Sequence, residues 1–160
     1  SDALAAGAAA GSLRRNFQGY TTDPHPTLIG LGASSIGRLP QGFVQNASNE
    51  VAWRAAISEG RLPVARGVVL TDDDRLRGDV IERLMCDFAV DLGQIAARHG
   101  VLPSVFADDR VRLQRLVADG LVVVNGDQVV LTPEGRPFVR LAAQAFDRHS
   151  TDDHGFSRVV

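Results

Sequence analysis

The residues best suited to chemistry lie between positions 14 and 37. A polar stretch, 14–22, contains almost nothing that would build a core, and an apolar run broken by glycines follows at 28–37. The side chains of interest are two arginines, two aromatic rings, an amide and one isoleucine: Arg14, Arg15, Phe17, Tyr20, Gln18 and Ile36. Aromatic rings stack on a ligand, amides hydrogen-bond and guanidinium groups bind carboxylates, while glycines let the backbone approach closely. This pattern is typical of a binding edge.

Taken singly, these residues leave simpler interpretations open. Phe17 beside Gln18 could be a core ring next to a surface amide, and Ile36 after two serines could be a core residue. Arg14, Arg15 and Arg38 could be solvated surface residues. His25 lies between two prolines and is better explained as a turn residue than as a base.

The chain has one cysteine, Cys86, which excludes an internal disulfide and suits a reducing cytoplasm. Cys86 lies in an apolar helical pattern, so we expect a buried structural thiol. One cysteine cannot form a cysteine-based cluster or zinc site, and we predict no metal ligand in this chain. No apolar run approaches the ~20 residues of a membrane span, so we expect no membrane partner.

The elements that must position these residues are expected in a first domain, 1–61. We predict a helix over 2–10, a loop or short strand over 13–22, and a turn at 23–26. Residues 28–31 are short and apolar, which favours a buried strand of a parallel sheet or barrel. A small-residue loop at 32–37, a strand at 42–46, a helix from Ser48 to Gly60 and a connector at 62–71 should follow.

A second domain, 72–147, has a more regular pattern, and a tail, 148–160, follows it. We predict three helices: one after Thr71, one capped by Asp91 and one capped by Ser104. A hairpin over 121–131 with a type I′ Asn-Gly turn and a helix starting at Thr132-Pro133 should complete the unit. This order predicts an α+β, mainly helical fold with a winged-helix-like second domain.

Winged helices often bind DNA, but the charge of this unit argues against it. Residues 72–147 contain 13 acidic residues and 9 arginines, and the whole chain carries a net charge of −2. Phosphate contact needs a basic footprint. We therefore expect no nucleic acid partner and interpret the unit as a packing module.

Several strings in the chain resemble one enzyme family. They are Asn-Phe-Gln-Gly-Tyr-Thr-Thr at 16–22, Leu-Ile-Gly-Leu-Gly at 28–32, and the segments 42–46, 66–71, 79–86 and 156–160. The chain resembles the C-terminal part of the oxygen-independent coproporphyrinogen III oxidases, the HemN family of the radical SAM superfamily. The related haem-chaperone branch has an Asn-Tyr-Trp-type sequence at the first string, which favours the oxidase.

The resemblance implies a radical oxidoreductase of haem and porphyrin biosynthesis. A reduced [4Fe–4S] cluster would cleave S-adenosylmethionine to a radical that abstracts a β-hydrogen from a propionate of coproporphyrinogen III. Loss of carbon dioxide and an electron would leave a vinyl group, and two such steps give protoporphyrinogen IX. The cofactor carries the hard chemistry, and the protein orients the reactants. Residues 1–61 would be the last elements of an incomplete (β/α) barrel, and residues 72–147 its cover.

The resemblance also assigns roles to residues. Phe17, Gln18 and Ile36 would bind the cofactor, Ile36 through its backbone, whereas Arg14, Arg15 and Tyr20 would meet the substrate. The cluster cysteines would lie upstream of Ser1, so we predict no catalytic residue here, an inactive isolated chain, and an electron donor that acts through the missing domain. The full-length protein would be a monomer, although this chain could self-associate.

Alternatives are a winged-helix regulator or a haem chaperone using His25, His99, His149 or His154.

Overall fold

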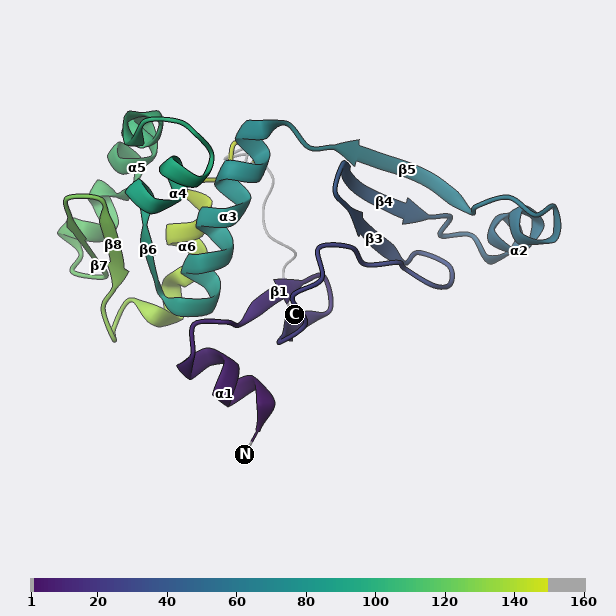
Figure 1. Cartoon of the computed structure of the whole chain (residues 1–160), viewed down its shortest axis with the longest axis horizontal. Coiled ribbons are helices and arrows are strands. Elements are labelled where there is room, and N and C mark those ends of the chain that lie inside the picture. The colour runs from purple at the N-terminus through teal and green to yellow at the C-terminus, as the bar shows by residue number, and fades with distance from the viewer. Residues whose placement is uncertain (1, 150–160) are drawn as a thin grey trace. The chain divides into compact units, whose positions relative to one another are not determined.

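The computed structural model describes residues 2–149, which divide into two compact units (Figure 1). The larger unit combines residues 2–22 with 73–149, and the smaller unit comprises residues 23–72. Both contain helix and sheet, and the described residues form no closed barrel. None of their helices has the length and apolar character needed to cross a membrane.

The larger unit begins with a short helix and a hairpin and continues with the predicted helical pattern. Its elements are α1 (Ala3–Ala9), β1 (Arg14–Asn16), β2 (Gly19–Thr21), α3 (Asp72–Asp87), β6 (Ala89–Asp91), α4 (Leu92–Arg98), η1 (Pro103–Phe106), α5 (Ala107–Ala118), β7 (Val122–Asn125), β8 (Gln128–Leu131), η2 (Arg136–Phe138) and α6 (Val139–Gln144). Three strands form an antiparallel sheet in the order β6-β8-β7.

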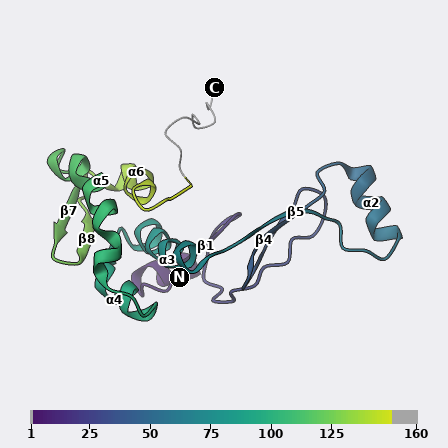
Figure 2. The ribbon, with the colours of Figure 1, turned by 90° about the horizontal axis from the view of Figure 1, so that it is seen from above.

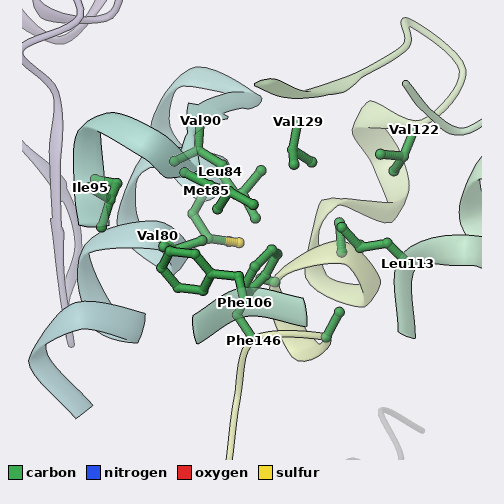
Figure 3. Packing of buried hydrophobic residues seen from close by; sticks show 14 of the residues in the cluster. Val80, Leu84, Met85, Val90, Ile95, Phe106, Leu113, Val122, Val129 and Phe146 are labelled. Atoms are coloured by element: carbon green, nitrogen blue, oxygen red, sulfur yellow. The ribbon is translucent and has the colours of Figure 1, made fainter. Parts of the chain in front are cut away.

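One hydrophobic core holds this unit together, and Figure 3 shows its packing. Fully buried side chains come from α3, α4, η1, α5, the sheet and the last helical segment; among them are Val80, Leu84, Leu92, Ile95, Phe106, Leu113, Val129 and Phe146. Phe106 and Phe146 meet edge to face with ring centroids 6.0 Å apart. The helical spacing in the sequence therefore predicted the buried face of α3 correctly.

A buried ion pair joins α3 to α5 beside this core. Arg77 Nη1 donates to Asp109 Oδ2 at 2.5 Å, and Arg77 Nε donates to Asp73 Oδ2 at 2.8 Å. The side chains of Arg77 and Asp109 are 4% and 0% exposed. Burial opposes the charge of Arg77, but the hydrogen bonds to the two carboxylates outweigh it and raise the pKa of the guanidinium.

The smaller unit is a three-stranded antiparallel sheet with one helix. Its strands are β3 (Ile36–Leu39), β4 (Gly42–Asn46) and β5 (Val64–Val69), in the order β3-β4-β5. Helix α2 (Glu50–Ser58) follows β4 and lies beyond the end of the sheet where β4 finishes and β5 begins (Figures 1 and 2). Within residues 23–72, the only buried apolar side chains are Ala56 and Pro63. This unit therefore has almost no core of its own.

Two expectations for the smaller unit are wrong. Residues 28–31 are not a buried strand: Leu28 makes one antiparallel bridge to Arg38, and Leu31 is 85% exposed. Beyond this single bridge the glycine run forms a loop, which Asn46 on β4 holds through the main-chain oxygens of Gly30 and Gly32. Residues 62–71 are not a plain connector, because β5 pairs with β4 along its length. Its exposed valines gave no alternating pattern that would mark a strand.

Helix and turn boundaries also differ from expectation. Asn49 rather than Ser48 caps α2, and Ser104 lies inside the 3₁₀ turn η1 instead of capping α5. The Thr132 side chain caps a turn that precedes η2, so the last helix starts later than predicted. The β7–β8 turn is centred on Gly126 and Asp127, and only Gly126 has positive φ, which is not the type I′ pattern. Most of the predicted tail, residues 150–160, lies outside the described residues.

Candidate functional site

The β1–β2 hairpin presents the predicted cofactor residues at its tip. Arg14 pairs with Thr21, Arg15 with Tyr20 and Asn16 with Gly19, so Phe17 and Gln18 form the two-residue turn. The Asn16 carboxamide oxygen accepts the backbone N–H of Gln18 at 2.8 Å and that of Gly19 at 3.2 Å. This local bond explains why the polar stretch folds as a tight turn. The Phe17 ring is 57% exposed, as a ligand contact would require.

Two of the predicted substrate residues already have partners on α3. Arg14 Nη1 lies 2.9 Å from Glu82 Oε2, and the Tyr20 hydroxyl donates to the main-chain oxygen of Met85 at 3.1 Å. That carbonyl lies in the last turn of α3, where helical carbonyls lack intrahelical partners. Both side chains therefore have a structural task. Arg15 is exposed, and its guanidinium makes no ion pair with a described residue.

Ile36 lies on β3, the outer strand of the smaller unit's sheet. Arg38 exchanges two backbone hydrogen bonds with Leu28, on the side away from β4. Backbone groups alternate in direction along a strand, so the N–H and C=O of Ile36 also face this outer edge. Gly30 packs closely against this edge of β3: a Cβ atom at position 30 would lie 3.0 Å from the Ile36 carbonyl. The edge thus offers main-chain groups of Ile36 beside a glycine backbone.

The structure gathers five of the six predicted residues on one hairpin. Ile36 lies in the other unit, and the positions of the two units relative to one another are not determined. The roles of all six residues in binding remain predictions.

Residues that the sequence analysis did not select also shape these elements. Glu82 binds both Arg14 and the backbone N–H of Arg15, and nothing in its helical surroundings signalled this role. Buried Asn46 donates to the main-chain oxygens of Gly30 and Gly32 and holds the glycine loop against β4. Asn46 is a polar residue at the end of the predicted strand 42–46, and this position was the sequence signal that could have indicated its role.

Cys86 and His25 are the other groups that the sequence analysis weighed for chemistry. Cys86 is buried, and burial raises the pKa of its thiol, which confirms the predicted inert cysteine. His25 binds the carboxylate of Asp23, whose pKa is lowered by the backbone N–H and then by the ring of His25. The described residues contain no group of three or more His, Cys, Asp or Glu side chains able to hold a metal ion.

A comparison with protein families finds one match in the chain. A family model described as the HemN C-terminal domain matches residues 70–138. Residues 70–138 are thus similar to this domain. Its start agrees closely with the beginning of α3 at Asp72.

Relatives extend the similarity beyond this domain. The chain is 51% identical over 138 residues to "Oxygen-independent coproporphyrinogen III oxidase" of Bradyrhizobium diazoefficiens, covering 86% of this chain and 31% of the relative. It is 46% identical to the protein of that name from Cereibacter sphaeroides, covering 92% of this chain and 33% of the relative. The chain spans about a third of the length of these relatives.

A solved structure agrees with these relatives. The chain matches the structure titled "Coproporphyrinogen III oxidase (HemN) from Escherichia coli is a Radical SAM enzyme" with a TM-score of 0.89 and 35% identity. The match covers 94% of this chain and 35% of that one. The chain is therefore similar to the C-terminal part of a HemN enzyme, as the sequence analysis predicted.

Proposed function

We propose that this chain is the C-terminal part of an oxygen-independent coproporphyrinogen III oxidase. The whole protein would convert two propionates of coproporphyrinogen III into vinyl groups and yield protoporphyrinogen IX in the cytoplasm. The observation that carries this proposal is the 51% identity over 86% of the chain to a protein of that name. The similarity includes the tip of the β1–β2 hairpin as well as the HemN C-terminal domain, because the alignments of other relatives cover up to 99% of the chain.

Within that enzyme, the hairpin and the β3 edge would orient S-adenosylmethionine. When bound, this cofactor supplies the hydrogen-abstracting chemistry of radical SAM enzymes. The exposed Phe17 ring provides an apolar face, and Gln18 provides an amide that donates and accepts. The main-chain groups of Ile36 face the outer edge of β3, beside Gly30, and would meet the edge of an adenine there. Arg15 would bind a substrate propionate.

The residues of this chain do not fit a [4Fe–4S] cluster. Such a cluster is usually held by cysteine thiolates, and the only cysteine, Cys86, is buried in the hydrophobic part of α3. The cluster ligands and the contact with the electron donor would therefore come from other residues of the whole protein. We expect this chain alone to be inactive and to self-associate through its exposed apolar surface.

The proposed architecture follows from the element order. We propose that helices α3, α4 and α5 with the β6-β8-β7 sheet form a winged-helix-like domain, and that the β3-β4-β5 sheet is the edge of a partial barrel. The contacts of α5 argue against DNA reading. Arg110 binds Asp127 and the main-chain oxygen of Gly126, while Arg112 reaches the main-chain oxygen of Ala145. Arginines engaged in this way are poor phosphate ligands.

A haem titration tests the haem-chaperone alternative. His25, His99 and His149 each place one ring nitrogen against an aspartate, namely Asp23, Asp79 and Asp74. A carboxylate on one ring nitrogen is compatible with metal ligation by the other, so a titration of the chain with haem that leaves the Soret band unchanged would count against this alternative. The remaining alternative ligand, His154, lies outside the described residues.

A graft tests the proposal on this chain directly. We would replace the matching third of the Bradyrhizobium relative with this chain and measure anaerobic formation of protoporphyrinogen IX from coproporphyrinogen III. We expect turnover within about tenfold of the parent enzyme, and a loss of at least about tenfold with Phe17→Ala, because orientation of the reactants is lost. A folded graft that binds both cofactors yet forms no product would contradict the proposal.

A further inference from the structure

The contacts between α3 and the segment that leads into the β1–β2 hairpin carry a further inference. Glu82 engages β1 with both carboxylate oxygens: one pairs with the Arg14 side chain at 2.9 Å, and the other accepts the Arg15 N–H at 3.3 Å. Arg83 donates to the main-chain oxygen of Leu13 at 2.7 Å and to that of Gly11 at 3.2 Å. Two adjacent residues of one helix therefore make four polar contacts with residues 11–15.

The second strand is held by the same helix. Tyr20 on β2 donates its hydroxyl proton to the Met85 carbonyl, as described above. Both strands of the hairpin are thus attached to the last two turns of α3. Asp87 fixes the position of the Arg83 side chain, because its carboxylate accepts a hydrogen bond from Arg83 Nη1 at 2.7 Å. An i,i+4 pair of this kind restrains the rotamer of the arginine.

Burial makes these polar contacts stronger than ordinary surface pairs. The side chains of Glu82 and Arg83 are 14% and 19% exposed, so solvent screens them less than a fully exposed pair. The hairpin needs this support. It has two strands of three residues each, and an isolated two-stranded hairpin is marginally stable in water.

We propose that Glu82 and Arg83 are positioning residues that fix the hairpin so that Phe17 and Gln18 can meet the cofactor. Phe17 lies two residues beyond Arg15. The hydrogen bonds from the backbone N–H groups of Gln18 and Gly19 to the Asn16 side chain fix the turn, so the orientation of β1 determines where Phe17 lies. Helix α3 belongs to the HemN C-terminal domain, whereas the hairpin precedes that domain. We call the contacts of Glu82 and Arg83 with residues 11–15 the clamp. Through the clamp the C-terminal domain acts on cofactor binding, an inference that rests on the proposed function of Phe17 and Gln18.

Hydrogen exchange of this 160-residue chain tests the clamp without any activity assay. We expect Glu82→Ala to accelerate exchange of the amides at 15–20 by about tenfold or more, because a charge-assisted contact to β1 is lost. The amides of Val80 and Leu84 serve as internal references for the fold of α3. Asp79→Asn is the matched control, since Asp79 lies on the same helix but contacts His99 of α4. Unchanged exchange at 15–20 in Glu82→Ala would overturn the proposal.

Exchanging the charges of Arg14 and Glu82 is a control that distinguishes loss of this ion pair from a general loss of structure. Glu82→Arg should loosen the hairpin, and the double variant Arg14→Glu/Glu82→Arg should restore at least part of the protection, because the ion pair is rebuilt with opposite polarity. Failure of the double variant to recover any protection, with the α3 references intact, would contradict a role for this pair.

The full-length protein then tests the link to the cofactor. We expect Glu82→Ala to weaken binding of S-adenosylmethionine about tenfold, with Asp79→Asn unchanged. A loosened hairpin with unchanged cofactor affinity would overturn the positioning role. Absence of cofactor binding by the unaltered full-length protein would instead refute the proposed function, while the exchange experiment would still decide whether the clamp exists.

Discussion

At the scale of single residues, the Arg77–Asp109 pair is the most consequential polar contact of the core. It lies beneath the Phe106 ring, whose centroid is 5.9 Å from the guanidinium carbon of Arg77. Asp109 Oδ1 has no hydrogen-bond partner in the structure, so the carboxylate depends strongly on Arg77. Breaking such a pair leaves a desolvated charge, which costs more than the pair itself contributes.

We therefore expect Asp109→Asn to lower the free energy of unfolding by about 3 kcal/mol. Chemical denaturation of the chain, followed by circular dichroism, measures this loss. Asp79→Asn removes a more exposed ion-pair partner, on α3, and should cost less than about 1 kcal/mol. Equal effects of the two substitutions would show that the burial of Asp109 adds nothing to stability.

A second residue-scale feature responds to pH. His149 Nε2 lies 2.9 Å from Asp74 Oδ1, and this hydrogen bond raises the pKa of the imidazole. A raised pKa in the folded state means that the contact stabilises the fold fully below the unfolded pKa of about 6.5. Its contribution is lost as the pH rises through the folded pKa. The last described residues should thus be held more firmly to α3 in mild acid.

An NMR titration of His149 tests this dependence. We expect a pKa above the ordinary value in the unaltered chain and a return toward it in Asp74→Asn. Asp147→Asn is the control, because Asp147 accepts the backbone N–H of His149 rather than its ring proton. If Asp147→Asn lowered the pKa as much as Asp74→Asn, the ring contact would not be the cause.

At the scale of elements, the turn between β8 and η2 depends on the absence of one side chain. A Cβ atom at Gly135 would lie 1.9 Å from the main-chain oxygen of Leu121. The Thr132 hydroxyl donates to the Gly120 carbonyl and accepts the Gly135 N–H, which fixes the turn in place. The close approach of two backbone segments therefore requires glycine here.

We expect Gly135→Ala to destabilise the chain by more than about 2 kcal/mol, because backbone must move to accept the methyl group. Gly78 on α3 provides the opposite case: no atom lies within 4 Å of its hypothetical Cβ, and Gly78→Ala should stabilise by about 1 kcal/mol. Thermal unfolding of both variants shows whether each substitution raises or lowers the stability of the chain. A neutral Gly135→Ala would contradict the close packing of the turn.

The elements also show what sequence patterns reveal. Helices α3, α4 and α5 and the β7–β8 hairpin were predictable because their buried faces recur at helical or alternating spacing and contact one another within this chain, whereas the three-residue strand β6 was not predicted. Segments 28–31 and 62–71 were not, because their apolar residues remain largely exposed and carry no periodic burial. For the site, composition and resemblance selected Phe17 and Gln18. Glu82 could not be found, since its partners lie 67 and 68 positions away.

At the scale of the molecule, the two units differ in how they are stabilised. The larger unit has the whole continuous core, whereas residues 23–72 rely on backbone pairing and on Asn46. Residues 23–72 also expose several large apolar side chains: Ile29, Leu31, Val51, Leu62, Val68 and Val69. A unit of this kind suits a sheet edge that is completed by further protein.

Under the proposed function, this chain is part of an anaerobic coproporphyrinogen III oxidase. Turnover by the full-length protein, reconstituted anaerobically and supplied with S-adenosylmethionine, an electron source and coproporphyrinogen III, tests this. We expect protoporphyrinogen IX and two molecules of carbon dioxide per substrate. A protein that binds cluster and cofactor but leaves the propionates intact would contradict it.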